Sequence, residues 1–113
     1  MRFEDIAKDV DVVYDTMGGD TQERSWKVVK KGGILVSIVS PPSKDVAAAH
    51  GVRAEYVFVQ PNTQELAEIA RLVDFGELKP IVETVLPLTE ARQAQELNKK
   101  GHTRGKIVLK VRG

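Results

Sequence analysis

Three short segments place glycine, proline or hydroxyl residues directly after apolar runs, so they are the first candidates for a ligand site. They are residues 15–19 (DTMGG), 39–42 (VSPP) and 59–61 (VQP). In an open parallel sheet, ligands bind outside the carboxyl ends of the strands. Glycine at such an end lets the backbone approach a ligand closely. Ordinary turns between strands and helices are the alternative interpretation of all three segments.

The sequence contains none of the usual groupings of catalytic residues. Its two histidines, His50 and His102, are far apart and have no cysteine or carboxylate partner at the spacing of a metal site. The serines at positions 37, 40 and 43 have no neighbouring base and no glycines of a nucleophile elbow. We therefore predict no catalytic residue and no metal ligand. Asp15 stands beside the glycine turn and is predicted to form an Asx turn.

Phosphate-binding loops are also missing from the sequence. No GxGxxG run is present, and residues 101–106 (GHTRGK) fall one residue short of a P-loop and lack the hydroxyl residue after lysine. If this protein binds a nucleotide, we expect the segment that holds its pyrophosphate to lie outside these residues.

Composition narrows the class of protein. The 113 residues carry 17 basic and 16 acidic side chains, interspersed along the chain, which argues against a nucleic-acid-binding surface. There is no cysteine, so disulfides and thiolate metal sites are excluded. No apolar run approaches the length of a membrane span. We expect one small domain in the cytoplasm, with no nucleic-acid or membrane partner.

Hydrophobic patterning predicts an alternation of strands and helices. Trp26 is predicted to pack against the sheet, and Asp20 with Glu23 resembles a capping box. Asn62 and Thr89 are predicted helix caps. The apolar runs at residues 10–14 and 34–39 lack clean alternation, which is typical of parallel strands covered on both faces. Predicted strands span residues 10–14, 34–39, 53–59, 81–86 and 106–111, and predicted helices span 21–30, 45–50, 63–75 and 90–100.

The chain resembles the C-terminal part of medium-chain dehydrogenase/reductases, specifically the zinc-independent quinone or enone reductase branch. The resemblance lies in four segments, DVDVVYDTMGGD, KKGGILVSIVS, GELKPIVETVLPLTEARQAQEL and GHTRGKIVLKV. It implies an α/β fold: the second half of a Rossmann-like parallel sheet with flanking helices, followed by a C-terminal β-α-β return segment. Residues 1–78 would belong to the dinucleotide domain, and residues 79–113 would return to the catalytic domain.

The resemblance also implies a function and a site. The intact parent would use NADPH to transfer a hydride to a quinone or an α,β-unsaturated carbonyl. This chain would lack the GroES-like domain and the first βαβ units, and so would be inactive alone and bind NADP(H) weakly. Cofactor-binding positions carried over from the family are Thr16, Met17, Gly18, Val39, Ser40, Phe58, Val59 and Thr103.

A non-catalytic nucleotide-binding or dimerisation module is the alternative function. The predicted strand at residues 54–59 is apolar and has no lysine or proline to protect it as a sheet edge. The resemblance implies that this strand pairs across a two-fold axis, as in the family, so we expect a homodimer. A second free edge is expected on the side of Ile34.

Overall fold

The computed structural model describes residues 2–113, which form two units that we describe separately: unit 1 (Met1–Pro61) and unit 2 (Asn62–Gly113). Unit 1 contains η1 (Phe3–Asp5), β1 (Val10–Asp15), α1 (Gly19–Ser25), β2 (Val29–Ser37), α2 (Lys44–His50) and β3 (Arg53–Tyr56). Unit 2 contains α3 (Thr63–Asp74), β4 (Val82–Pro87), η2 (Leu88–Glu90), α4 (Ala91–Lys99) and β5 (Lys106–Lys110). The domain boundary predicted after residue 78 stays a prediction.

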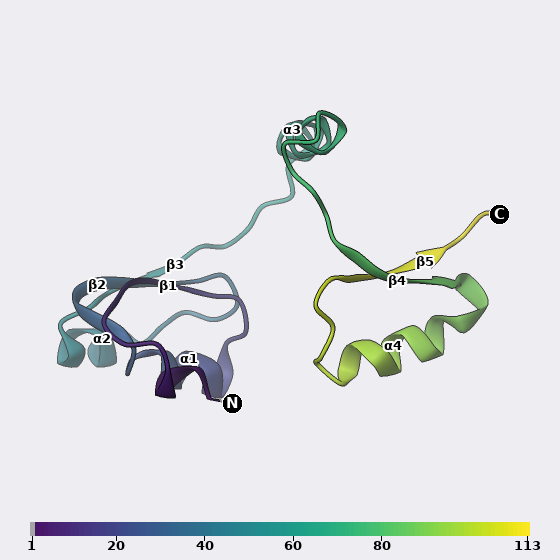
Figure 1. Ribbon diagram of the computed structural model, residues 1–113. Helices are drawn as coiled ribbons and strands as arrows, with labels where there is room; N and C mark the ends of the chain where they lie inside the picture. The colour runs from purple at the N-terminus through teal and green to yellow at the C-terminus, as the bar shows by residue number, and fades with distance from the viewer. Residues whose placement is uncertain (1) are drawn as a thin grey trace. The chain divides into compact units, whose positions relative to one another are not determined.

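Unit 1 is built on a three-stranded parallel sheet in the order β1-β2-β3. Val13 lies opposite Leu35, and Leu35 lies opposite Ala54. Helices α1 and α2 lie on the same side of this sheet (Figure 1). The expected α/β class and the parallel direction of the first three strands are therefore confirmed.

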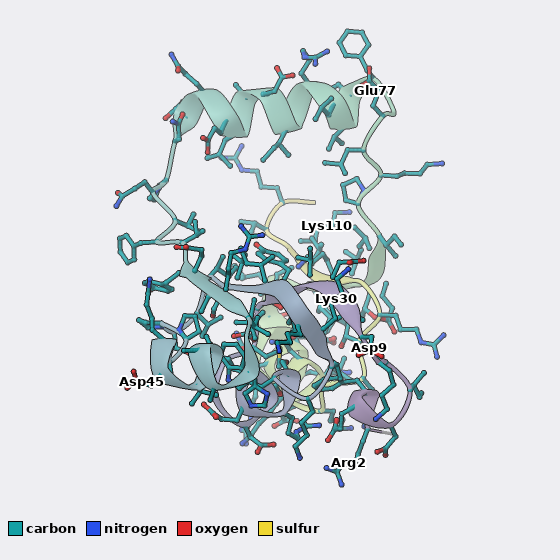
Figure 2. The ribbon with its side chains drawn as sticks, turned by 90° about the vertical axis from the view of Figure 1, so that its left-hand side faces the viewer. Arg2, Asp9, Lys30, Asp45, Glu77 and Lys110 are labelled. Carbon is teal, nitrogen blue, oxygen red and sulfur yellow. The ribbon has the colours of Figure 1, made fainter. Side chains whose placement is uncertain are left out.

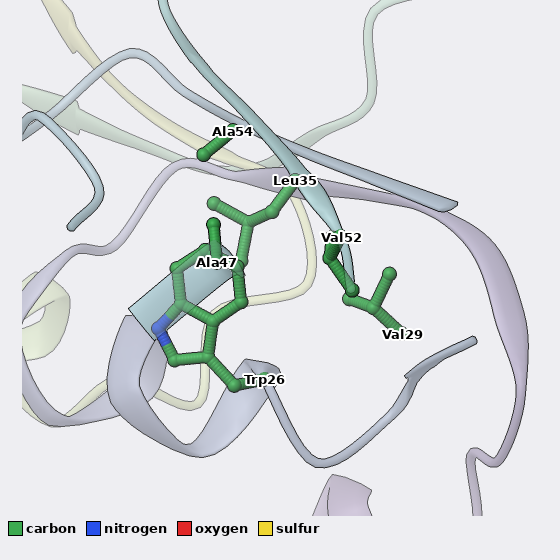
Figure 3. Packing of buried hydrophobic residues seen from close by; sticks show 6 residues of the cluster. All are labelled: Trp26, Val29, Leu35, Ala47, Val52 and Ala54. Carbon is green, nitrogen blue, oxygen red and sulfur yellow. The ribbon is translucent and has the colours of Figure 1, made fainter. Parts of the chain in front are cut away.

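The core of unit 1 lies between the sheet and these two helices. Trp26 follows α1 and packs against Leu35, which is fully buried at the centre of the sheet (Figure 3). Ala47 from α2 packs against the same cluster. The predicted packing role of Trp26 is confirmed. Its indole also stacks on His50, with ring centroids 6.2 Å apart.

The other face of the sheet carries apolar side chains that unit 1 leaves partly or largely exposed. Val12 and Tyr14 of β1 are 59% and 63% exposed. Val36 of β2 is half-buried on the same face. Within unit 1, β1 and β3 form the two edges of the sheet, so the free edge expected on the side of Ile34 was wrongly placed. Ile34 belongs to β2, which is paired on both sides.

The short N-terminal segment is held to α1 by a buried carboxylate. Glu4 is only 4% exposed. Its two carboxylate oxygens form ion pairs with the guanidinium groups of Arg24 at 2.8 Å and Arg2 at 2.7 Å. Burial raises the pKa of Glu4, but a backbone hydrogen bond and the two arginines outweigh it and lower this pKa to about 2. Arg24 also lies over the ring of Phe3, 5.0 Å from its centroid.

The first helix is shorter than predicted, and the strand after it is longer. The helix predicted for residues 21–30 covers only Gly19–Ser25, because Val29 is already paired with Val10 in the sheet. Lys30, predicted at a helix end, lies in β2 and forms an ion pair with Asp11. The predicted capping box is also wrong: Gly18 is the N-cap, and Asp20 pairs with Arg24 instead.

Unit 2 contains a complete β-α-β segment. Its strands β4 and β5 pair in parallel, and α4 packs against them through the buried Ala94. The expected C-terminal β-α-β segment is thus confirmed. Thr89 is not the cap that was predicted, because it lies inside η2 and Glu90 is the residue that precedes α4. The predicted cap at Asn62 is confirmed, since its side chain accepts from the N–H groups of Gln64 and Glu65.

Charged side chains lie mostly at the surface of each unit. Arg2 and Asp45 of unit 1 and Glu77 of unit 2 are exposed examples (Figure 2). Among the described helices, none is long and apolar enough to cross a membrane.

Candidate functional site

A buried carboxylate organises the carboxyl end of β1. Asp15 is the last residue of this strand and is 4% exposed. Its Oδ1 accepts hydrogen bonds from the N–H groups of Met17 at 3.0 Å and Gly18 at 2.9 Å. The predicted Asx turn is confirmed, and it fixes the loop that leads from β1 into α1.

The second oxygen of Asp15 reaches two other elements. Its Oδ2 accepts from the hydroxyl of Ser37, the last residue of β2, at 2.8 Å, and from Nε2 of Gln22 in α1 at 2.9 Å. Gln22 Nε2 also lies 3.0 Å from the carbonyl oxygen of Ser40. The Ser37 hydroxyl accepts in turn from the N–H groups of Val39 and Ser40 at 3.2 and 3.3 Å.

We call Asp15, Gln22 and Ser37 the strand-end clamp, and the loop residues 16–18 and 39–40 the rim. The clamp joins the two loops that follow neighbouring parallel strands, where ligands bind in open parallel sheets. All three clamp side chains are at least 95% buried. A buried polar network of this kind is rigid when its members are satisfied.

The clamp keeps Asp15 ionised. Burial raises the pKa of this carboxyl, but the hydrogen bonds from the N–H of Gly18, from Gln22 and from Ser37 outweigh it and lower the pKa below its ordinary value. At neutral pH the two rim loops are therefore anchored to an ionised carboxylate, and both of its oxygens already accept hydrogen bonds from the protein.

Gly18 owes its identity to the packing of the two rim loops. It has a φ of 70°, and a Cβ atom there would lie 2.9 Å from Cγ1 of Val39 and 3.3 Å from the hydroxyl oxygen of Ser40. Any larger residue would push the loops apart. Met17 and Val39 remain 71% and 47% exposed at the rim.

An open, mostly apolar hollow of about 330 Å³ runs beside β1 and ends at the rim. This volume is at the lower end of the roughly 300–1,000 Å³ range of ligand pockets. Tyr14, Thr16 and Met17 contribute to its lining. The hollow and the exposed rim side chains fit a contact with part of a flat ligand, and they are too small to enclose a whole dinucleotide.

The structure brings five of the eight predicted site residues together: Thr16, Met17 and Gly18 in one rim segment, Val39 and Ser40 in the other. Phe58 and Val59 lie beyond the end of β3 and are 70% and 61% exposed. Thr103 belongs to unit 2, where it lies half-buried in the loop before β5. Their predicted roles stay predictions.

Sequence reasoning missed two of the three clamp residues. Ser37 was considered only as a nucleophile, and Gln22 was not considered at all. A signal was present for Ser37, because a lone hydroxyl residue inside an apolar strand must find a partner when it is buried. Gln22 lies seven residues after Asp15, and its role depends on the crossing of α1 over the strand ends.

Metal-binding groups are not gathered anywhere within residues 2–113. No group of three histidine, cysteine or carboxylate side chains in this part of the chain could hold a metal ion. The described residues therefore do not fit a zinc site.

The fold and its strand-end site define the class of this chain: a parallel α/β unit of the Rossmann type followed by a β-α-β segment. The model of the family described as zinc-binding dehydrogenase matches residues 1–109. The chain belongs to this family, as a C-terminal part of the medium-chain dehydrogenase/reductase type.

Individual relatives support the same class. A probable zinc-binding oxidoreductase, mitochondrial, from Arthroderma benhamiae is 31% identical over 104 residues, covering 89% of this chain and 31% of the relative. The mitochondrial NAD(P)H oxidoreductase RTN4IP1 from Mus musculus is 29% identical over 125 residues, covering 89% of this chain and 32% of the relative. The structure of the quinone oxidoreductase from Coxiella burnetii superimposes with a TM-score of 0.78 at 34% identity, covering 97% of this chain and 36% of that one.

The chain spans about a third of the length of these relatives. Its relatives are oxidoreductases, which makes this chain part of an oxidoreductase fold.

Proposed function

We propose that this chain is a fragment of an NADPH-dependent oxidoreductase whose intact form transfers hydride to a quinone or an α,β-unsaturated carbonyl. The observation that carries this proposal is the strand-end clamp, which holds two rim loops together at the carboxyl ends of adjacent parallel strands. The names of the relatives agree with it, since they include a quinone oxidoreductase, a 2-methylene-furan-3-one reductase and NAD(P)H oxidoreductases.

A related fold supports NADPH as the cofactor of the parent protein. The 2-octenoyl-CoA carboxylase reductase CinF was solved in complex with NADP, and it matches 89% of this chain with a TM-score of 0.69 at 21% identity. When bound, such a cofactor supplies the hydride. The rim of this chain would help to position the cofactor. Met17 and Val39 offer it exposed apolar contacts, and Thr16 offers a hydroxyl at the end of the hollow.

We further propose that the chain alone is inactive and that the reaction of the intact parent needs no zinc. It spans about a third of its relatives, and its described residues contain no pyrophosphate-binding glycine fingerprint. The test is NADPH oxidation by the purified chain with a quinone acceptor, together with NADPH calorimetry. We expect no turnover and weak NADPH binding, with a dissociation constant in the millimolar range. Turnover, or micromolar binding, would contradict the proposal.

A second proposal is that the chain forms a homodimer through the edge of β3 and the residues after it, which would also serve a non-catalytic module. Val57 donates its N–H to the carbonyl of Ser37, so the extended backbone continues past β3 beside β2. Val57 is 47% exposed and Phe58 is 70% exposed. An exposed apolar edge of this kind can pair with a strand of a second chain, which supports the proposal.

Light scattering on two variants tests this dimer. Val57→Lys places a charge on the edge and should convert a dimer into a monomer. Leu88→Lys, at a comparably exposed position in unit 2, is the control and should leave the mass unchanged. A Val57→Lys protein with the wild-type mass would argue against pairing through β3.

A cytoplasmic location stays a proposal as well, and the mitochondrial names of several relatives give reason to test it by imaging.

A further inference from the structure

We propose that Asp15, Gln22 and Ser37 are positioning residues, which set the two rim loops in the arrangement that receives the cofactor without touching it themselves. This inference rests on the proposed function and deepens it, because it names the groups on which cofactor affinity depends. Each of the three is at least 95% buried, so a ligand at the rim would meet the loops and not the clamp.

The first loop depends on Asp15 for its shape. The carboxylate holds the N–H groups of Met17 and Gly18 on one oxygen, which turns the chain sharply after β1. Met17 is thereby presented with 71% of its surface exposed. Hydrogen bonds to a charged acceptor are stronger than neutral ones, so this turn is well fixed.

The second loop depends on Ser37 and Gln22. The Ser37 hydroxyl donates to Asp15 and accepts from the N–H groups of Val39 and Ser40. Gln22 bridges from Asp15 to the carbonyl oxygen of Ser40. An apolar residue at position 37 would avoid the cost of burying a hydroxyl, but it would leave two backbone N–H groups of the rim without their acceptor.

The two loops are coupled, because the clamp connects them through a single carboxylate. Removing the Ser37 hydroxyl leaves Oδ2 of Asp15 with Gln22 as its remaining donor and releases the second loop, so the effect should spread through the carboxylate to Met17 and Gly18. Gly18 transmits the same coupling sterically, since it packs against Val39 with no room for a Cβ atom. A purely structural contribution would instead weaken all of unit 1 evenly.

Amide hydrogen exchange of the full chain, followed by NMR, separates these two cases. The variants are Ser37→Ala and Gln22→Met, and the control is Val52→Ala, which truncates a buried core residue outside the clamp. In Ser37→Ala we expect the amides of Val39 and Ser40 to exchange about tenfold faster, corresponding to one lost hydrogen bond each. The amides of β2 should change no more than in the control.

Cofactor titration supplies the second readout. NADPH is added to wild type and variants, and its dissociation constant is read from the shifts of rim amides. We expect Ser37→Ala to weaken binding about tenfold beyond Val52→Ala, and Ser37→Thr, which keeps the hydroxyl, to restore it. Gln22→Met serves if Ser37→Ala does not fold.

The outcomes are distinguishable. Equal acceleration of exchange throughout unit 1, or NADPH binding by Ser37→Ala that matches Val52→Ala, would overturn the positioning role while the proposed function stands. Rim-specific acceleration without any NADPH shift in wild type would overturn the proposed function, and with it the cofactor role of the clamp.

Discussion

Replacing Asp15 with asparagine tests how much the strand-end clamp contributes to folding. The substitution keeps the shape of the side chain and removes its charge. An asparagine has one acceptor oxygen, so its NH₂ group must face one of the two sets of donors from which Asp15 accepts. One set is the N–H groups of the rim, and the other is Gln22 Nε2 with the Ser37 hydroxyl. A hydroxyl can turn to accept, but Gln22 Nε2 cannot.

The magnitude follows from the number of bonds affected. A hydrogen bond to a charged group contributes about 1.5–3 kcal/mol net, and a buried donor left unpaired costs about 1–3 kcal/mol. The orientation that loses least turns the asparagine NH₂ group towards Gln22 and Ser37. Only the bond from Gln22 is then lost and the others become neutral, so we expect the free energy of unfolding to fall by about 2–4 kcal/mol. Proteins are stabilised by roughly 0.05–0.15 kcal/mol per residue, which for the length of unit 1 corresponds to about 3–9 kcal/mol, so the expected loss is a large part of this unit's stability.

Urea unfolding at neutral pH measures this loss directly. Trp26 is the chain's single tryptophan and lies buried in the core of unit 1, so its fluorescence reports on this unit. Asp20→Asn is the matched control, because it removes the same charge from a side chain that is 85% exposed. We expect the control to change stability by less than about 0.5 kcal/mol. An Asp15→Asn protein as stable as Asp20→Asn would refute the clamp as a stabilising network.

Two further predictions concern the same unit. Unit 1 should lose stability as the pH falls from 4.5 towards about 2, because the pKa of Glu4 is lowered in the folded state and the unfolded carboxyl takes up its proton first. When the midpoint of urea unfolding is plotted against pH, Glu4→Gln should flatten this part of the curve. Glu23→Gln, at an exposed site, should leave the curve unchanged. A curve that Glu4→Gln does not alter would contradict the role of this carboxylate. Leu35→Ala, at a fully buried position, should lower the free energy of unfolding by about 2–5 kcal/mol in the same urea assay. Ile6→Ala, at a position of unit 1 that is 66% exposed, should be nearly neutral, and equal effects of the two substitutions would contradict the place of Leu35 in the core.

Those parts of the fold that depend on local pattern could be predicted from sequence. Sequence patterns predicted β1, β5 and the helix cap at Asn62, because each of these features depends on only a few consecutive residues. The direction of the strands followed from the helices between them. Pairing decided the boundary of α1 differently: Val29 joins the sheet opposite Val10, and no helical pattern could show that.

The clamp could not be predicted, because its members come together only in the folded chain. Asp15 and Ser37 are 22 residues apart and meet because β1 and β2 are in register. The glycine at position 18 was expected to permit a positive φ or a close approach of the backbone to another group. The structure shows a φ of 70° and a close approach to Val39 of the neighbouring loop. The local pattern therefore pointed to two loops that the structure brings together, and it gave only part of the reason for their packing.

Amide-resolved NMR titration of the full chain with NADPH tests the central claim most directly, which is that the rim of unit 1 is the chain's share of a dinucleotide site. We predict millimolar binding with shifts centred on residues 16–18 and 39–40. Shifts confined to unit 2, or no shift in the rim at saturating millimolar NADPH, would contradict it.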